Sequence, residues 1–382
     1  MDFDYTEEQT LLRETVRKFA KEKLLPRIPR GGEQHPFAYN HLKEFSQLGF
    51  LGMPILEQYG GMPLDGVSEA IVIEELSRCD AAFGFFVAMH SGLVCRTISN
   101  WGTEEQKKFY LPLLASGEKY GVCSPAEIGS ISEAENFVCR AEKKGDKYVL
   151  NGTKFFSSDL TVEDFAIVFA KDTEKDSQIS AFIVPKNSNG FRNGEFVSNT
   201  GLGGFVIKPF TLTDVVVPEE NVIGGEGVRG KGLELLLDII PIGKLGIAAR
   251  SLGLAERALE EAIKYSSERV QRKKPIQTYP TIQTLIAEMA TEIEASRWML
   301  YHAASQREKG KNISLEGAMA KLFCTRTAKR VIDKALSVHG CYGYTKDFII
   351  ERLYREVKLG ELYEGTHEMQ KILIASKILS KR

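Results

Sequence analysis

The chain has 382 residues, of which 26% are charged, and its formal net charge at pH 7 is −1. This length is enough for two or three domains with a large core, and the near-neutral balance gives no indication of a nucleic-acid partner. The chain does not start with a basic segment followed by an apolar run. No unbroken apolar stretch reaches the roughly 18 residues that indicate a membrane span, so we expect none.

The six cysteines and six histidines are dispersed along the chain. There is no Cys-x-x-Cys pair, and no pair of either type has metal-ligand spacing, so we expect no metal site. Isolated cysteines of this kind are expected to be reduced and mostly buried, which favours a cytoplasmic protein. The cysteines are Cys79, Cys95, Cys123, Cys139, Cys324 and Cys341.

The first part of the chain, residues 1–117, is predicted to be an N-terminal helical domain. Thr6 and Gln9 have the spacing of a capping box, in which each side chain bonds the backbone of the other residue. Apolar residues then recur at helical steps up to Pro26, which ends the helix. Two further helices are predicted, of which the second is apolar enough to be buried: Asp65–Cys79 and Ala81–Ile98.

The middle part, residues 118–228, consists of short β-rich runs separated by turn residues. Branched and aromatic side chains dominate these runs, as they do in strands. Strands this short and evenly spaced predict a small antiparallel barrel or sandwich. The predicted strands are Lys147–Leu150, Phe165–Phe169, Ile179–Val184 and Phe210–Val217.

The last part, residues 229–382, is predicted to be a C-terminal four-helix-bundle domain. Apolar residues recur at three- and four-residue steps from Leu245 to Ala262, and a second stripe runs from Ile282 to Ile293. Such stripes suit helix packing within one chain and equally an interface between subunits. The fold class is thus predicted to be α+β, in the order helices, strands, helices.

Three glycines between the last two parts, Gly225, Gly227 and Gly230, formally match the dinucleotide-binding fingerprint. That fingerprint requires a strand before it and a β–α–β unit around it. A long helix-rich region follows here instead, so we interpret the glycines as a hinge into the C-terminal bundle.

The segment Leu362–Glu368 reads Leu-Tyr-Glu-Gly-Thr-His-Glu, with a carboxylate between an aromatic residue and a glycine. Glycine lets the backbone approach a ligand closely. Shielding Glu364 from water would raise its proton affinity toward that of a general base at neutral pH. The same residues also fit an ordinary helix start, with Thr366 as the cap and Glu368 in the first turn.

This segment is one of a series of short motifs. The others are Thr6-Glu7-Glu8-Gln9, Tyr59-Gly60-Gly61, Gly102-Thr103-Glu104-Glu105-Gln106, Asn151-Gly152-Thr153-Lys154, Val217-Pro218 with Asn221, and Gly340 through Tyr344. In this order and spacing, the motifs resemble the acyl-CoA dehydrogenase family over nearly the whole chain. The resemblance implies the same three domains that the periodicity predicts.

In that family, the glutamate of the Glu-Gly-Thr motif removes the α-proton of a fatty-acyl thioester, and FAD accepts the β-hydrogen as hydride. The resemblance implies this base role for Glu364. Some relatives carry an alternative catalytic glutamate at the place of Gly243, and glycine removes that option. The resemblance implies flavin contacts at Ser124, Phe156, Ser158 and Thr366, and substrate contacts at Ser130, Lys244, Tyr363 and Gly365.

Several family patterns are altered in this chain. Thr-Glu-Pro-x-Ala-Gly-Ser-Asp becomes residues 124–131, Arg-x-x-Phe-Gly-Lys becomes residues 269–274, a glutamine becomes Pro280, and Gln-x-x-Gly-Gly becomes residues 337–341. The last three patterns hold the pyrophosphate and adenine half of FAD across a subunit interface in the family. The positions that correspond to these contacts are Arg269, Arg272, Ser337 and Gly340.

Three explanations of the altered positions remain open. The basic run at 269–274 grips the pyrophosphate directly, since guanidinium groups suit phosphate oxygens. Alternatively, a different homologous subunit supplies the contacts, or FAD binds weakly or not at all. The basic run would also suit a solvated helix end.

The predicted function is FAD-dependent dehydrogenation of an acyl-CoA to the 2,3-enoyl-CoA. The resemblance implies a homotetramer that passes electrons to an electron-transfer flavoprotein or another acceptor. One alternative is a dehydrogenase that acts on an acyl-carrier-protein thioester in a biosynthetic pathway. Another is a subunit of a hetero-oligomeric dehydrogenase, which need not be catalytic.

Overall fold

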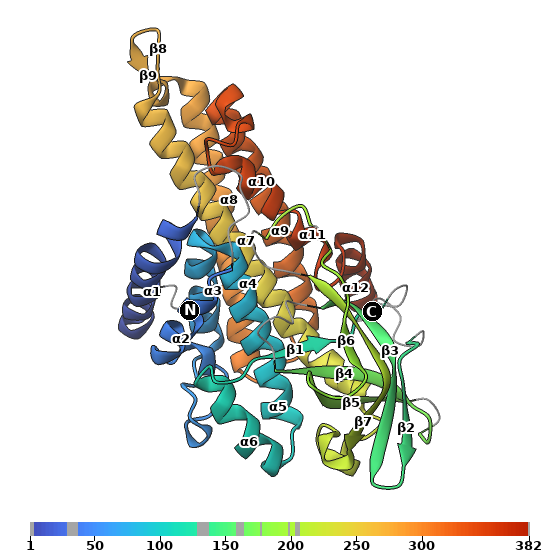
Figure 1. The fold of residues 1–382 in the computed structure, drawn as a ribbon. Coiled ribbons are helices and arrows are strands. Elements are labelled where there is room, and N and C mark those ends of the chain that lie inside the picture. The colour runs from blue at the N-terminus through green and yellow to red at the C-terminus, as the bar shows by residue number, and fades with distance from the viewer. Residues whose placement is uncertain are drawn as a thin grey trace.

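The computed structural model describes residues 4–28, 37–127, 137–157, 164–175, 178–197, 199–202 and 207–380. Helices come first, a β-sheet follows, and long helices complete the chain (Figure 1). The sheet lies beside one end of the long C-terminal helices, and the N-terminal helices pack along their other side (Figure 1). The predicted α+β class and the order of its three parts are confirmed.

The N-terminal helices begin with the predicted capping box. The N–H of Gln9 donates to Oγ1 of Thr6 over 3.1 Å, and Oε1 of Gln9 accepts from the N–H of Thr6 over 3.3 Å. The first helix passes through a π-turn at Ala20–Leu24 into a 3₁₀ turn that contains Pro26. The α-helices of this part are α1 (Glu7–Phe19), α2 (Tyr39–Gln47), α3 (Gly66–Cys79), α4 (Ala81–Met89), α5 (Arg96–Trp101) and α6 (Glu104–Ala115).

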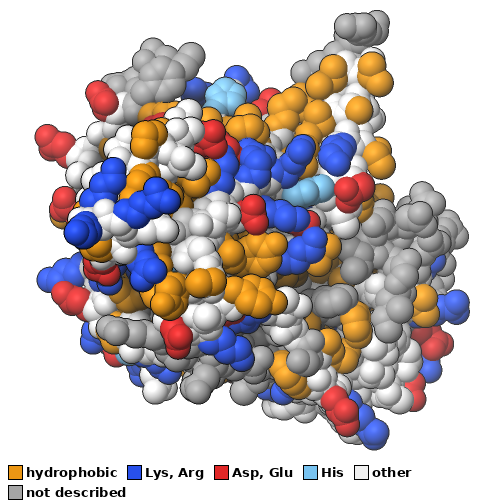
Figure 2. Space-filling view, turned by 90° about the horizontal axis from the view of Figure 1, so that it is seen from above, with side chains coloured by type: hydrophobic (Ala, Val, Ile, Leu, Met, Phe, Trp, Pro, Cys, Tyr) orange, Lys and Arg blue, Asp and Glu red, His pale blue; other side chains and the backbone are white. Residues whose placement is uncertain are grey.

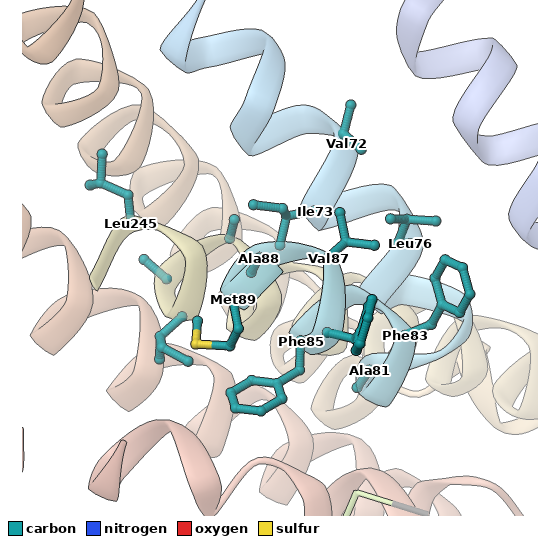
Figure 3. Packing of buried hydrophobic residues seen from close by; sticks show 14 of the residues in the cluster. Val72, Ile73, Leu76, Ala81, Phe83, Phe85, Val87, Ala88, Met89 and Leu245 are labelled. Atoms are coloured by element: carbon teal, nitrogen blue, oxygen red, sulfur yellow. The ribbon is translucent and has the colours of Figure 1, made fainter. Parts of the chain in front are cut away.

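The predicted helix over 81–98 is interrupted by a π-turn. It consists of α4, the π-turn His90–Cys95 and α5. Among the described residues, Ala81–Trp101 is the one helical stretch long and apolar enough to cross a membrane, and 94% of its apolar window is buried. This stretch is therefore part of the core. Figure 3 shows α4 beside Ile73 and Leu76 of α3, with Phe85 and Met89 on the opposite side of α4, and Leu245 of α7 (Gly232–Glu268) belongs to the same core cluster.

The middle part forms a seven-stranded sheet in the order β1-β4-β2-β3-β7-β6, with β5 paired to β4. Four pairs of neighbouring strands are antiparallel, but β4 pairs in parallel with both β1 and β2. The predicted β domain is confirmed, although its sheet is mixed and not wholly antiparallel. The strands are β1 (Gly121–Ser124), β2 (Arg140–Lys144), β3 (Lys147–Ser157), β4 (Phe165–Asp172), β5 (Ile179–Pro185), β6 (Phe191–Asn193) and β7 (Lys208–Pro218).

The C-terminal helices form the predicted bundle around α7. Pro280 stands at the first position of α8, where proline is well tolerated because no intrahelical N–H bond is lost. A short hairpin, β8 (Val270–Gln271) with β9 (Lys274–Pro275), joins α7 to α8. The remaining helices are α8 (Pro280–Glu308), α9 (Ser314–His339), α10 (Ile350–Glu356), α11 (Leu359–Leu362) and α12 (His367–Leu379).

The glycine-rich link between sheet and bundle is a 3₁₀ turn at Gly225–Gly227, and α7 begins at Gly232, five residues later. The strand before it, β7, pairs antiparallel with β3 and β6. A dinucleotide fingerprint needs parallel strands around its helix. The geometry therefore agrees with a connection between two domains and not with a dinucleotide site.

Close packing of α3 on α7 fixes the position of the long helix. A Cβ added to Gly253 of α7 would lie 2.3 Å from the carbonyl oxygen of Glu74 on α3. Backbone cannot yield as a flexible side chain does, so only glycine permits this helix spacing. The same helix carries residues 243 and 244, and its placement therefore sets their positions.

We predict that Gly253→Ala lowers the free energy of unfolding by about 1–3 kcal/mol, because the added methyl forces the two helices apart. Denaturant unfolding measures the change. Gly227→Ala is the matched control, since nothing lies within 4 Å of a Cβ there. We expect that control to change the stability by less than about 0.5 kcal/mol. Equal stability of Gly253→Ala and the unmodified chain would contradict the packing constraint.

Candidate active site

The segment between α11 and α12 contains an unusual backbone turn. Glu364 has a φ of +54° and Gly365 a φ of +83°, so both lie in the left-handed region. Glycine adopts this conformation freely, whereas for glutamate it costs about 1–2 kcal/mol. Thr366 then caps α12, its Oγ1 accepting a 3.4 Å hydrogen bond from the N–H of Met369. The predicted helix start is confirmed, and it directly follows the turn that carries the glutamate.

The carboxyl group of Glu364 lies against α7 at Gly243. A Cβ added to Gly243 would lie 2.7 Å from the carboxyl carbon and 2.9 and 3.1 Å from its two oxygens. A residue with a side chain would therefore displace the carboxylate. Glycine at this position does more than remove an alternative base, because it makes the room that Glu364 occupies.

Burial and two lysines together set the proton affinity of Glu364. Loss of water around the half-buried side chain raises its pKa to about 7, against the opposing charges of Lys244 and Lys321. Burial in turn lowers the pKa of Lys244, and it lowers that of Lys321 to about 8. A carboxyl group that titrates near neutral pH can both accept and release a proton at the pH of most cells.

Aromatic and strand residues complete the surroundings of this carboxyl group. The ring of Tyr363 meets the ring of Phe85 edge to face, with centroids 4.9 Å apart. Burial, and then the charge of Glu364, raises the pKa of the Cys123 thiol on β1. The turn is therefore enclosed by α4, α7 and β1, and by Lys321 of α9.

Ser124, at the end of β1, has a buried hydroxyl group. Its side chain is 2% exposed, and Oγ has no hydrogen-bond partner among the residues that the structure describes. A buried polar group without a partner is unfavourable, so such a hydroxyl suits a bound ligand that completes its hydrogen bonding. The predicted flavin contact at Ser124 is consistent with this geometry and stays a prediction.

The loop after Ser124 is held by a buried ion pair that sequence reasoning missed. Nζ of Lys154 lies 2.6 Å from Oε1 of Glu127, and the two side chains are 0% and 3% exposed. The other oxygen of Glu127 accepts from the N–H of Val138. Lys154 belongs to one of the motifs quoted above. Its sequence context does not indicate burial or a partner 27 positions earlier in the chain. The pair fixes Glu127 to β3, the strand that also contains Phe156.

Three predicted contacts cannot be placed. Ser130 and Ser158 lie outside the residues that the structure describes, and of Phe156 only the position in β3 is described. Their roles remain predictions.

The predicted ligands of the adenine half lie far from Glu364. Arg269 ends α7, 26 residues beyond Gly243, which at about 1.5 Å per residue is about 39 Å. Ser337 lies 16 residues beyond Lys321 on α9, or about 24 Å. Two helices thus separate these predicted ligands from the region of Glu364 by about 24–39 Å.

The residues of this distant group are exposed. The guanidinium of Arg269 lies 5.3 Å from the ring centroid of Tyr342, which follows Gly340. Arg272 stands at the tip of the β8–β9 hairpin with a φ of +50°. Arg269, Arg272, Ser337 and Gly340 are all exposed. Seen from above, the molecular surface mixes apolar and basic side chains (Figure 2).

Comparison with known proteins agrees with this geometry. Residues 6–118, 124–215 and 230–379 match the N-terminal, middle and C-terminal domains of acyl-CoA dehydrogenase. The chain is 38% identical to the short-chain specific acyl-CoA dehydrogenase of Clostridium acetobutylicum, covering 99% of this chain and 100% of that protein. The chain belongs to the acyl-CoA dehydrogenase family.

Two further relatives of this acyl-CoA dehydrogenase are informative. The structure of butyryl-CoA dehydrogenase from Megasphaera elsdenii superposes with a TM-score of 0.93 at 32% identity, covering 99% of this chain and all of that chain. The CarC subunit of the caffeyl-CoA reductase-Etf complex of Acetobacterium woodii is 34% identical over 99% of this chain and 100% of that protein. The protein is an FAD-dependent oxidoreductase that acts on acyl-CoA.

We predict that the raised pKa of Glu364 costs stability at neutral and alkaline pH. The unfolded pKa is about 4.5 and the folded one about 7, so the folded chain binds the proton more tightly. The stabilisation of the folded state by this tighter proton binding is therefore fully present below pH 4.5 and is lost as the pH rises through 7. Glu364→Gln should match the unmodified protein in stability near pH 4.5. Above pH 7 it should be more stable by up to about 3 kcal/mol.

Thermal unfolding of both proteins across pH 4.5–8.5 measures this difference. Glu361→Gln is a control of opposite sign. Burial alone would raise the pKa of Glu361, but hydrogen bonds from Lys358 and Lys329 hold it below its usual value. Its replacement should therefore destabilise the protein at neutral pH. A difference between Glu364→Gln and the unmodified protein that does not change with pH would contradict the predicted burial cost.

Proposed function

We propose that Glu364 is the base that removes the α-proton of an acyl-CoA in this enzyme. The position of its carboxyl group against Gly243, together with a pKa near neutral, carries the proposal. A free carboxylate is too weak a base for a proton α to a thioester, so both the base and the carbonyl need activation. Loss of water strengthens the base, while backbone N–H groups near the thioester oxygen would stabilise the developing negative charge.

FAD, when bound, supplies the acceptor for the β-hydrogen, which leaves as hydride. We propose that Ser124, Phe156, Ser158 and Thr366 hold its flavin half. The buried hydroxyl of Ser124 is the observation that favours this set. We further propose that Ser130, Lys244, Tyr363 and Gly365 contact the substrate. Of these, Lys244, Tyr363 and Gly365 lie beside or within the turn that carries Glu364.

We propose that the adenine half of FAD is bound by a second copy of this chain. The distance along α7 and α9 supports this proposal, because the group of Arg269, Arg272, Ser337 and Gly340 is separated by about 24–39 Å of helix from the region of Glu364 of the same chain. A homotetramer would provide such a neighbour. In a hetero-oligomer, a different homologous subunit would provide it.

The acyl group is proposed to be short. The support is that the relative with 38% identity is named as short-chain specific. The predicted alternative, an acyl-carrier-protein thioester in place of acyl-CoA, is less favoured, because the relatives of 38% identity are acyl-CoA dehydrogenases.

We propose that electrons leave through an electron-transfer flavoprotein. The 34% identical CarC is a subunit of a complex that contains Etf, which supports a similar partner here.

The six cysteines are unpaired and five are buried, which supports the proposed cytoplasmic location.

The decisive prediction concerns Glu364→Gln. Anaerobic mixing of the purified enzyme with short-chain acyl-CoA should bleach the flavin absorption near 450 nm. In Glu364→Gln the flavin should stay bound but unbleached, because the amide cannot accept the proton. In the unmodified enzyme, the bleaching rate at subsaturating substrate should rise through pH about 7 as Glu364 ionises. Normal bleaching of Glu364→Gln would remove Glu364 from the reaction.

A second prediction concerns the adenine half. Arg269→Ala and Arg272→Ala should each weaken FAD binding roughly tenfold, since a hydrogen bond between charged groups is lost. Equilibrium dialysis of the apoprotein against FAD measures the affinity. Lys346→Ala, an exposed cation beyond the same end of the bundle, is the matched control and should bind FAD normally. Unchanged affinity in both arginine variants would exclude the proposed contacts.

A further inference from the structure

The two carbonyl groups of the left-handed turn are both bonded by buried side chains. Nε2 of Gln370, in the first turns of α12, donates to the carbonyl oxygens of Glu364 and Gly365, each over 3.0 Å. Nζ of Lys321 on α9 also donates to the carbonyl oxygen of Gly365. The Lys321 side chain is 0% exposed and that of Gln370 is 2% exposed. The turn is therefore held from two helices by donor residues that are almost fully buried.

These hydrogen bonds hold the part of the segment whose backbone conformation is least favourable, the left-handed residues Glu364 and Gly365. Left-handed geometry is unfavourable at Glu364, so the turn persists only where its surroundings hold it. Gln370 also makes the glycine necessary, because a Cβ on Gly365 would lie 2.9 Å from Nε2. A residue with a side chain at 365 would thus lose both the conformation and the contact.

Lys321 differs from an ordinary structural lysine in what it faces. A fully buried ammonium is unfavourable unless a negative charge and hydrogen-bond acceptors lie close to it. Its acceptor here is a neutral carbonyl, and Glu364 is the negative charge that acts on it most strongly. The titratable groups around the turn are Lys244 of α7, Lys321 of α9, Cys123 of β1, and Glu361, Tyr363, His367 and Glu368 of the segment itself.

We propose that Lys321 and Gln370 are positioning residues that clamp the Glu364–Gly365 turn, so that the carboxylate of Glu364 stays against Gly243. Lys321 has a second role, because its positive charge favours the ionised form of that carboxylate. The clamp rests on contacts within this chain. Its importance for the reaction rests on the proposed role of Glu364 as the base.

Hydrogen exchange tests the clamp without any reaction. Lys321→Met and Gln370→Leu keep the approximate volume of each side chain but remove the donors. In the FAD-loaded protein, each should speed amide exchange within residues 363–371 roughly tenfold, as expected for the loss of a buried hydrogen bond. Lys329→Met is the matched control: this lysine lies two turns further along α9, is half exposed, and pairs with Glu361. It should leave the exchange of the segment unchanged.

Flavin reduction tests the consequence for the reaction. Both variants should bleach with short-chain acyl-CoA about ten- to a hundredfold more slowly, at nearly unchanged substrate affinity, because a displaced base slows proton removal more than it weakens binding. In Lys321→Met, the acid limb of the pH profile should also move to higher pH. Loss of a nearby positive charge raises the pKa of a carboxyl group. Lys329→Met should react as the unmodified enzyme does.

Gln370→Glu provides a second variant in case the apolar replacements do not fold. Its donors disappear as the new carboxyl group ionises, so exchange at the turn should accelerate with pH beyond the intrinsic increase. Unchanged exchange in every variant of Lys321 and Gln370 would overturn the clamp. Faster exchange with normal bleaching would overturn its role in positioning the base. If none of the thioesters tested bleached the flavin of the unmodified enzyme, the proposed function would fail. The exchange experiment would still decide whether the clamp exists.

Discussion

The unbroken helix α7 is the constraint on which the rest of the structure depends. One end provides the glycine against which the carboxyl group of Glu364 rests, and the other end leads into the basic hairpin. Because the helix is rigid, it fixes the separation of these two regions at about 39 Å. Its middle is locked to α3 by a glycine contact that leaves no room for adjustment. A single secondary-structure element thus places the proposed base and separates it from the residues proposed to serve a neighbouring subunit.

Buried charges join the N-terminal helices to this framework. The carboxylate of Glu74 on α3 is 1% exposed and accepts a 2.8 Å hydrogen bond from the hydroxyl of Tyr301 on α8. Arg13 of α1 and Arg297 of α8 both pair with it. Arg297 also pairs with Glu256 of α7. Removing one partner of these buried ion pairs is unfavourable, because an unpaired charge then remains in the core. The network therefore specifies one arrangement of the four helices α1, α3, α7 and α8.

Much of the architecture could be predicted from local patterns, because caps, apolar periodicity and turn residues are local properties. The Thr6–Gln9 box and the helix start at Thr366 are examples. Contacts between distant residues carry no such signal. Neither the pairing of Glu127 with Lys154 nor the hydrogen bond of Lys321 to the turn follows from any spacing in the chain. The parallel pairing of β4 with β1 and β2 escaped prediction for the same reason, since short strands alternate similarly in either direction.

The contact between Gly243 and the carboxyl group of Glu364 also restricts how such enzymes can evolve. The family resemblance implies that some members carry their catalytic glutamate at the place of Gly243. A side chain there would force the present carboxyl group of Glu364 to shift from its position against α7. Placing a glutamate on α7 at residue 243 would therefore favour a second substitution, at residue 364, that empties the space now filled by its carboxyl group.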